Sequence, residues 1–206
     1  MWSRRRVSSE SLPQASGRLS VKREEVPLGY STPAAGTIAG ADCISSAPSF
    51  VGGSTLITLI EVNEDNWMAF AALRVREEQK GFLDSALGIL ARGYAYRACR
   101  ARVFGVAEGE KAVGLALVKD LEEEPACYDL QQFMIDGRYQ GRGCGTQALK
   151  LILAELARER KYPCAEVCVK RKNAAALHLF EKLGFTDTGY IDPDVPDAVN
   201  LMYHFN

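Results

Sequence analysis

The sequence lacks any apolar run near the ~20 residues that a membrane-spanning helix needs, and its 206 residues carry a formal net charge of only -1. Without a surplus of either sign, neither nucleic acid nor an anionic membrane is an expected partner. Histidine is scarce, with two residues, and none of the six cysteines lies in a CxxC pair, so no metal site is expected. A signal-peptide core is also missing, which favours a cytoplasmic location. Cys164 and Cys168 flank an apolar strand and are expected to be buried structural thiols.

The chain is long enough for one α/β domain with an appendage. Residues 1–54 are rich in Ser, Gly, Pro and Ala and show no apolar periodicity, so we expect a disordered or poorly ordered extension there. A targeting peptide is the alternative, although Glu10, Glu24 and Glu25 do not suit an acid-poor transit sequence. The folded domain is expected at residues 55–206.

From residue 56 the apolar pattern becomes regular and predicts alternating strands and helices. Strands are expected at residues 56–62, 101–107, 112–118, 165–170, 186–191 and 200–205, with another ending at Ile135. Helices are expected at residues 82–97, 145–160 and 174–183, after a first one that carries Trp67, Phe70 and Leu73. Asn63 or Asp65 is the expected N-cap of that first helix. The order of elements predicts a mixed α/β sheet with an antiparallel hairpin and a right-handed parallel crossover.

A glycine-rich turn joins the strand that ends at Ile135 to an amphipathic helix. It contains Gly141, Gly143 and Gly145, and the helix begins at once. Free N–H groups and a partial positive charge at a helix start suit a diphosphate, and glycines allow the backbone to approach it closely. Arg142 is placed to add a direct phosphate contact. The spacing fits neither the dinucleotide GxGxxG motif nor the Walker motif.

The strand before this turn changes its alternation. Apolar residues fall at Tyr128 and Leu130, and then at Phe133 and Ile135, on the opposite parity. A strand that keeps one face buried needs an extra residue at such a point, so a β-bulge is predicted near Gln131. The alternative is that both faces are buried and parity carries no information.

Two motifs resemble the GCN5-related N-acetyltransferase (GNAT) superfamily. Residues 140–145 (QGRGCG) match its phosphate signature [Q/R]-x-x-G-x-[G/A]. A second motif, Asn-x-x-Ala-x-x-x-[Y/F]-x-x-x-Gly-Phe, is filled by Asn173, Ala176, Phe180, Gly184 and Phe185. The resemblance covers about residues 56–206 and implies an acyl-CoA N-acyltransferase fold, with antiparallel N-terminal strands and a splayed parallel pair at the centre of the sheet.

The resemblance implies acetyl-CoA as the acetyl donor. Met134 and Ile135 would pair through their backbone with the pantetheine arm, and Asn173 would cap its helix and reach the cofactor. Phe180 would contact the cofactor, pack in the core, or do both. The diphosphate would be held by the loop of Gln140, Gly141, Arg142, Gly143, Cys144, Gly145 and Thr146.

The resemblance also implies direct acetyl transfer to an amine that a carboxylate has deprotonated. Candidates for this base are Asp129, along the strand near the bulge, and Glu78, in the preceding helical region. Many members protonate the leaving thiolate with a tyrosine where this chain has Phe180. Here water or another group, such as Tyr139 or Tyr190, would supply the proton, or no donor is needed. Cys144 is not expected to act as a nucleophile, because its place in the loop normally accepts any residue.

The segment of residues 73–91 is similar to bacterial spermine/spermidine (diamine) N-acetyltransferases. Asp192, Asp194 and Asp197 could hold a polyamine by charge-assisted hydrogen bonds, or could belong to a polar turn. The alternatives are another small amine, an aminoglycoside-like antibiotic, a protein N-terminus, or a non-catalytic acetyl-CoA-binding module. A homodimer is left open.

Overall fold

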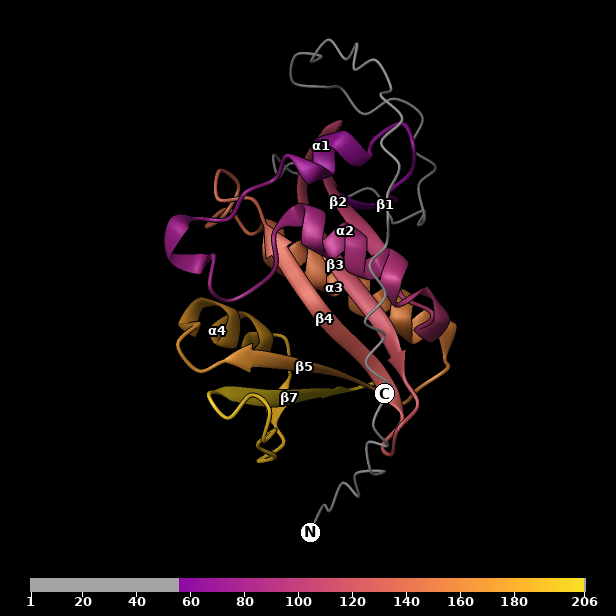
Figure 1. Cartoon of the computed structure of the whole chain (residues 1–206), viewed down its shortest axis with the longest axis vertical. Coiled ribbons are helices and arrows are strands. Elements are labelled where there is room, and N and C mark those ends of the chain that lie inside the picture. The colour runs from indigo at the N-terminus through magenta and orange to yellow at the C-terminus, as the bar shows by residue number, and fades with distance from the viewer. Residues whose placement is uncertain (1–55, 206) are drawn as a thin grey trace, which may run out of the picture. The chain divides into compact units, whose positions relative to one another are not determined.

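The computed structural model describes residues 56–205 (Figure 1). The expected extension at residues 1–54 therefore lies outside the described residues. The strands are β1 Ile57–Glu61, β2 Arg102–Glu108, β3 Lys111–Leu121, β4 Cys127–Ile135, β5 Cys164–Lys170, β6 Thr186–Asp187 and β7 Ala198–His204. The helices are α1 Trp67–Ala71, α2 Ala86–Ala95, α3 Cys144–Glu159 and α4 Ala174–Lys182, with 3-10 turns η1 Glu77–Gln79 and η2 Arg97–Cys99.

The strands form one mixed sheet in the order β1-β2-β3-β4-β5-β7-β6. β4 and β5 pair in parallel, while β2 and β3 form the expected antiparallel hairpin. The remaining neighbours are also antiparallel. This topology confirms the predicted mixed sheet with a central parallel pair.

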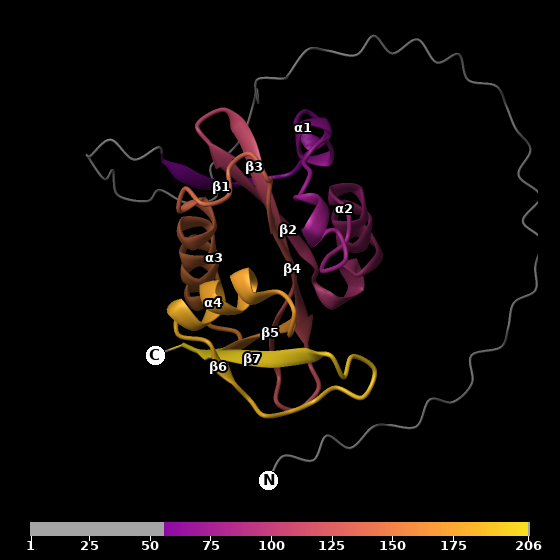
Figure 2. The same cartoon turned by 90° about the vertical axis from the view of Figure 1, so that its left-hand side faces the viewer.

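Helices cover both faces of the sheet. α1 and α2 lie on one face, and α3 and α4 lie on the other (Figure 2). Phe70 of α1 and Ile89 of α2 pack in one buried cluster. The predicted apolar stripe of α3 packs in a second cluster against the opposite face; it consists of Ala148, Leu149, Ile152, Leu153 and Leu156. Burial of this stripe determines where the N-terminus of α3 points.

The predicted bulge in β4 is confirmed. Leu117 of β3 lies opposite Gln132, but its neighbour Val118 lies opposite Leu130, so Gln131 is the extra residue between them. Because of this residue, Leu130 and Ile135 pack in the same cluster as α3 despite their opposite parity.

β4 and β5 are paired at one end and run apart beyond it (Figure 1). Their ladder contains Tyr128 opposite Ala165 and Asp129 opposite Glu166. The strands themselves continue to Ile135 and Lys170. The splay therefore begins just after Asp129, next to the bulge.

The start of the first helix differs from its expected form. The N-cap is Asn66, and the Asn63 side chain instead accepts hydrogen bonds from the N–H groups of Asp65 (3.1 Å) and Asn66 (3.3 Å) in the preceding turn. Helix α1 ends at Ala71, so Leu73 is buried but lies outside it. A local side chain-to-backbone turn has displaced the cap by one residue from the nearer candidate.

The two cysteines of β5 differ in exposure. Cys164 is buried beside Cys127 and Met202, as expected. Cys168 is exposed, and its prediction as a buried thiol is wrong. It lies beyond the part of β5 that pairs with β4, at a position where β5 is paired with β7 alone.

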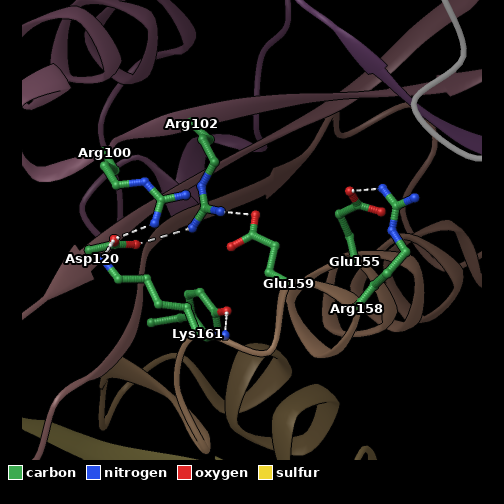
Figure 3. Close-up of polar contacts among 8 residues, drawn as sticks. Arg100, Arg102, Asp120, Glu155, Arg158, Glu159 and Lys161 are labelled. Atoms are coloured by element: carbon green, nitrogen blue, oxygen red, sulfur yellow. Dashed lines mark hydrogen bonds and ion pairs between the residues drawn. The ribbon is translucent and has the colours of Figure 1, made fainter.

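A charge network joins the C-terminal end of α3 to the sheet (Figure 3). The Asp120 carboxylate of β3 is almost fully buried and contacts Arg100 (3.2 Å), Arg102 (3.4 Å) and Lys161 (2.5 Å). Arg102 of β2 also pairs with Glu159 in the last turn of α3. Asp120 is thus the shared partner of three cations.

We expect Asp120→Asn to lower the free energy of unfolding by about 2–3 kcal/mol. Removing one partner of a fully buried pair costs ~3–5 kcal/mol, and the lower figure follows because the cations here partly reach water. Urea unfolding followed by circular dichroism measures the change.

The matched control is Glu155→Gln, which removes a separate surface pair with Arg158 on α3 (Figure 3). Its cost should stay below about 1 kcal/mol. Equal costs for the two variants would contradict a structural role for the Asp120 network.

Candidate functional site

A groove of about 630 Å³ opens where β4 ends, between the glycine turn and α4. Eight of the predicted cofactor residues line it: Met134, Ile135, Gln140, Gly141, Gly143, Gly145, Thr146 and Asn173. The groove therefore brings together residues from β4, the turn and the start of two helices. The Asn173 side chain caps α4 by accepting a hydrogen bond from Ala176 N–H (3.3 Å), as predicted.

The glycine turn lines this groove with Gly141, Gly143 and Gly145. Gly141 (φ 76°) and Gly143 (φ 82°) adopt left-handed conformations that favour glycine. Gly143 is the N-cap of α3, and no side chain among the described residues caps this helix start. The first-turn N–H groups consequently lack intrahelical partners and can bind an anion.

Gln140 holds the turn in place. Its side-chain amide donates to the Ile135 carbonyl (2.7 Å) and to Oε1 of Gln79 (2.8 Å). The first residue of the phosphate signature thus ties the turn both to the end of β4 and to η1. This contact uses only the side chain of Gln140 as donor and so occupies no backbone N–H group of the turn.

Asp136 directly follows the groove-lining residue Ile135 but does not itself line the groove. Its buried carboxylate accepts hydrogen bonds from Arg74 N–H (2.9 Å) and from the guanidinium of Arg138 (2.8 Å). Burial alone would raise the pKa of Asp136, but these hydrogen bonds outweigh it and hold the pKa below its usual value. In the sequence, the only sign of this residue is the position of an acidic side chain directly after a predicted strand.

Three predicted residues do not line the groove. Arg142 lies over the ring of Tyr139 (5.7 Å to the centroid), on which Arg138 also packs. Cys144 is buried, and burial raises the pKa of its thiol, which agrees with its expected lack of a nucleophilic role. Phe180 is buried in the core between Phe133 and Phe185.

Asp129 lies at the start of the splay. Its carboxylate is about 3.3 Å from Lys119 Nζ and accepts a hydrogen bond from Gln131 of the bulge (2.9 Å). Glu166 of β5 is its partner in the parallel ladder and is buried, whereas Asp129 is only partly buried. Two carboxylates therefore stand side by side where the strands separate, and Glu166 was missed because the register between distant strands is not a local property of the sequence.

A third carboxylate acts on the same region. Partial desolvation raises the pKa of the Cys168 thiol, and the negative charges of Asp192, Glu166 and Asp129 raise it further. Asp192, in the segment before β7, therefore acts electrostatically on the same thiol as Asp129 and Glu166.

The other predicted acids are placed differently. Asp197 pairs with Lys170 (3.0 Å), and this hydrogen bond lowers the pKa of its carboxyl. The backbone N–H of Asp194 donates to the Asp192 carboxylate (2.9 Å). Glu78 is exposed in η1 and does not line the groove.

Residues 56–205 contain neither a metal-ligand cluster nor a membrane-spanning helix. No group of three or more acidic, histidine or cysteine side chains in this range could hold a metal ion. None of its helices is both long and apolar enough to span a bilayer.

Comparison with solved structures places the fold among acetyltransferases. Spermidine N-acetyltransferase from Vibrio cholerae, in complex with CoA and spermine, superposes with a TM-score of 0.57 at 16% identity, over 72% of this chain and 95% of that one. The acetyltransferase from Agrobacterium tumefaciens strain C58 gives a TM-score of 0.58 at 15% identity, over 78% and 100% of the two chains.

Sequence comparison is more specific. Spermine/spermidine N(1)-acetyltransferase from Bacillus subtilis strain 168 is 27% identical over 139 residues, which is 66% of this chain and 91% of that protein. Residues 59–185 match the acetyltransferase (GNAT) family. This match spans more than half of the sequence and includes the glycine turn and the groove, so the chain belongs to the GNAT family of acetyltransferases.

Proposed function

We propose that this acetyl-CoA-dependent N-acetyltransferase acetylates a primary amine of a polyamine or diamine. The observation that carries the proposal is the pairing of the carboxylate residues Asp129 and Glu166 where β4 and β5 separate. The Asp192 charge acts with both of them on the Cys168 thiol. The names of the Bacillus subtilis relative and of the Vibrio cholerae neighbour support the same class of acceptor.

The donor half of the reaction belongs to the groove. When bound, acetyl-CoA supplies the activated acetyl group as a thioester. The N–H groups at the start of α3 suit its diphosphate, and the left-handed Gly141 and Gly143 leave the backbone unobstructed. Met134 and Ile135, at the end of β4, line the groove where the pantetheine arm would pair with the strand.

Binding and deprotonation of the amine acceptor are assigned to the carboxylates. A polyamine carries several ammonium groups, and separated carboxylates can hold them by charge-assisted hydrogen bonds. The reacting amine, with a free pKa near ~10, must lose a proton before it attacks the thioester. Asp129 and Glu166 stand at the splay and are the groups proposed to accept that proton, directly or through water.

Other parts of the expected chemistry stay predictions. Tyr139 is stacked beneath two guanidinium groups outside the groove, and Glu78 lies on the surface. The roles of Asp194 and Asp197, a cytoplasmic location, a homodimer, and the absence of nucleic-acid or membrane partners are likewise predictions.

We expect purified protein to release free CoA when acetyl-CoA is supplied with spermidine, spermine or short diamines. A thiol-reactive chromophore measures the release. Release with an aminoglycoside or a peptide N-terminus instead would move the protein to another acceptor class. If the protein binds acetyl-CoA but releases no free CoA with any of these amines, it is a non-catalytic binding module.

Gly143→Asp should weaken acetyl-CoA binding at least roughly a hundredfold, about 2.7 kcal/mol. The new carboxylate would add bulk and negative charge beside the diphosphate. Because a side chain at this left-handed position (φ 82°) is strained, circular dichroism checks that α3 is retained. Titration calorimetry measures the affinity.

Gly109→Asp is the matched control, because Gly109 also has a positive φ (60°) but lies in the β2–β3 turn with open space around it. Its affinity for acetyl-CoA should equal that of the unmodified protein. Unaltered binding in the Gly143 variant would remove the turn from the cofactor site.

Asp192→Asn should raise the KM for spermidine roughly tenfold, since a hydrogen bond to a charged group contributes about 1.5–3 kcal/mol. The KM for acetyl-CoA should not change. Asp187→Asn serves as the control, because its side chain can still accept the Gly189 N–H bond (2.8 Å) that shapes the turn after β6. A spermidine KM that is the same in both variants would refute the acidic acceptor site.

A further inference from the structure

Two basic side chains of α4 line the cofactor groove. His178 and Lys182 are separated by four residues, so they lie on the same face of the helix. Both are exposed, and neither forms an ion pair with another described residue. The wall of the groove therefore carries two basic side chains that are not neutralised by ion pairs with other described residues.

This wall lies beside the turn that suits the diphosphate. Leu179, between the two basic residues, has its Cδ2 3.6 Å from the position that a Cβ on Gly145 would occupy. Lys182 is three residues further along α4, or about 4.5 Å along the helix axis. Lys182 carries its ammonium group on a flexible four-carbon stem and lines the groove.

CoA carries two separate phosphate groups, and the glycine turn suits only one of them. Backbone N–H groups at a helix start suit the diphosphate, but the ribose also carries a 3′-phosphate. Arg142, the cation that the sequence placed at the phosphates, lies over Tyr139 instead of lining the groove. Arg76 lines the groove from the η1 side, and Lys182 and His178 line it from α4.

We infer that Lys182, assisted by His178, binds the 3′-phosphate of CoA and makes the protein prefer CoA to 3′-dephospho-CoA. A phosphate monoester has several oxygens that can accept hydrogen bonds from an ammonium and an imidazole on one helix face. The inference rests on the proposed placement of CoA in the groove.

Titration calorimetry with CoA and with 3′-dephospho-CoA tests the inference. The unmodified protein should bind CoA roughly tenfold more tightly. Lys182→Gln should weaken CoA binding by about the same factor and leave 3′-dephospho-CoA binding within about twofold, which abolishes the preference. His178→Gln should act in the same direction by roughly two- to fivefold.

Lys150→Gln provides the matched control, because Lys150 is exposed on α3 and does not line the groove. It should preserve both affinities. Equal weakening of both ligands by Lys182→Gln would assign Lys182 to the diphosphate and overturn the inference, as would an unchanged preference for CoA. If the unmodified protein binds neither ligand, the placement of CoA itself is wrong, and this failure differs from loss of the preference alone.

Discussion

The site depends on the early end of pairing between two neighbouring strands, β4 and β5, which both continue well beyond their last shared pair. β4 and β5 share rungs at Tyr128 and Asp129, and then the extra residue Gln131 redirects β4. Backbone groups beyond that point need other partners, and a ligand that lies along the strand can supply them. The same divergence exposes Cys168 and brings the Asp129 and Glu166 carboxylates to the point where the strands separate.

Features with a local cause were predictable from the sequence. Strand alternation has a period of two, so the change of parity between Leu130 and Phe133 required an extra residue. Gly141 and Gly143 marked the turn because left-handed backbone conformations favour glycine. The cap at Asn173 was implied by the family motif, and its side chain does accept the hydrogen bond from Ala176 N–H.

Features that depend on distant pairing were not predictable in this way. Glu166 meets Asp129 through a register between strands more than thirty residues apart, and no local pattern encodes it. Arg142 was expected at the phosphates from its position in the loop, but its stem can turn toward Tyr139, and sequence does not determine such a choice. The contribution of His178 and Lys182 to the groove required knowledge of which face of α4 meets the glycine turn.

The buried Asp120 network has an evolutionary consequence. It pins one end of α3, and the glycine turn forms the other end, 16 residues away or about 24 Å. A tilt of about 2° at the pinned end would shift the turn by nearly ~1 Å, a displacement that can slow an enzyme about a hundredfold. Natural selection for catalytic rate can therefore act on Arg102 and Asp120, and drift at these positions would first become visible as altered donor affinity.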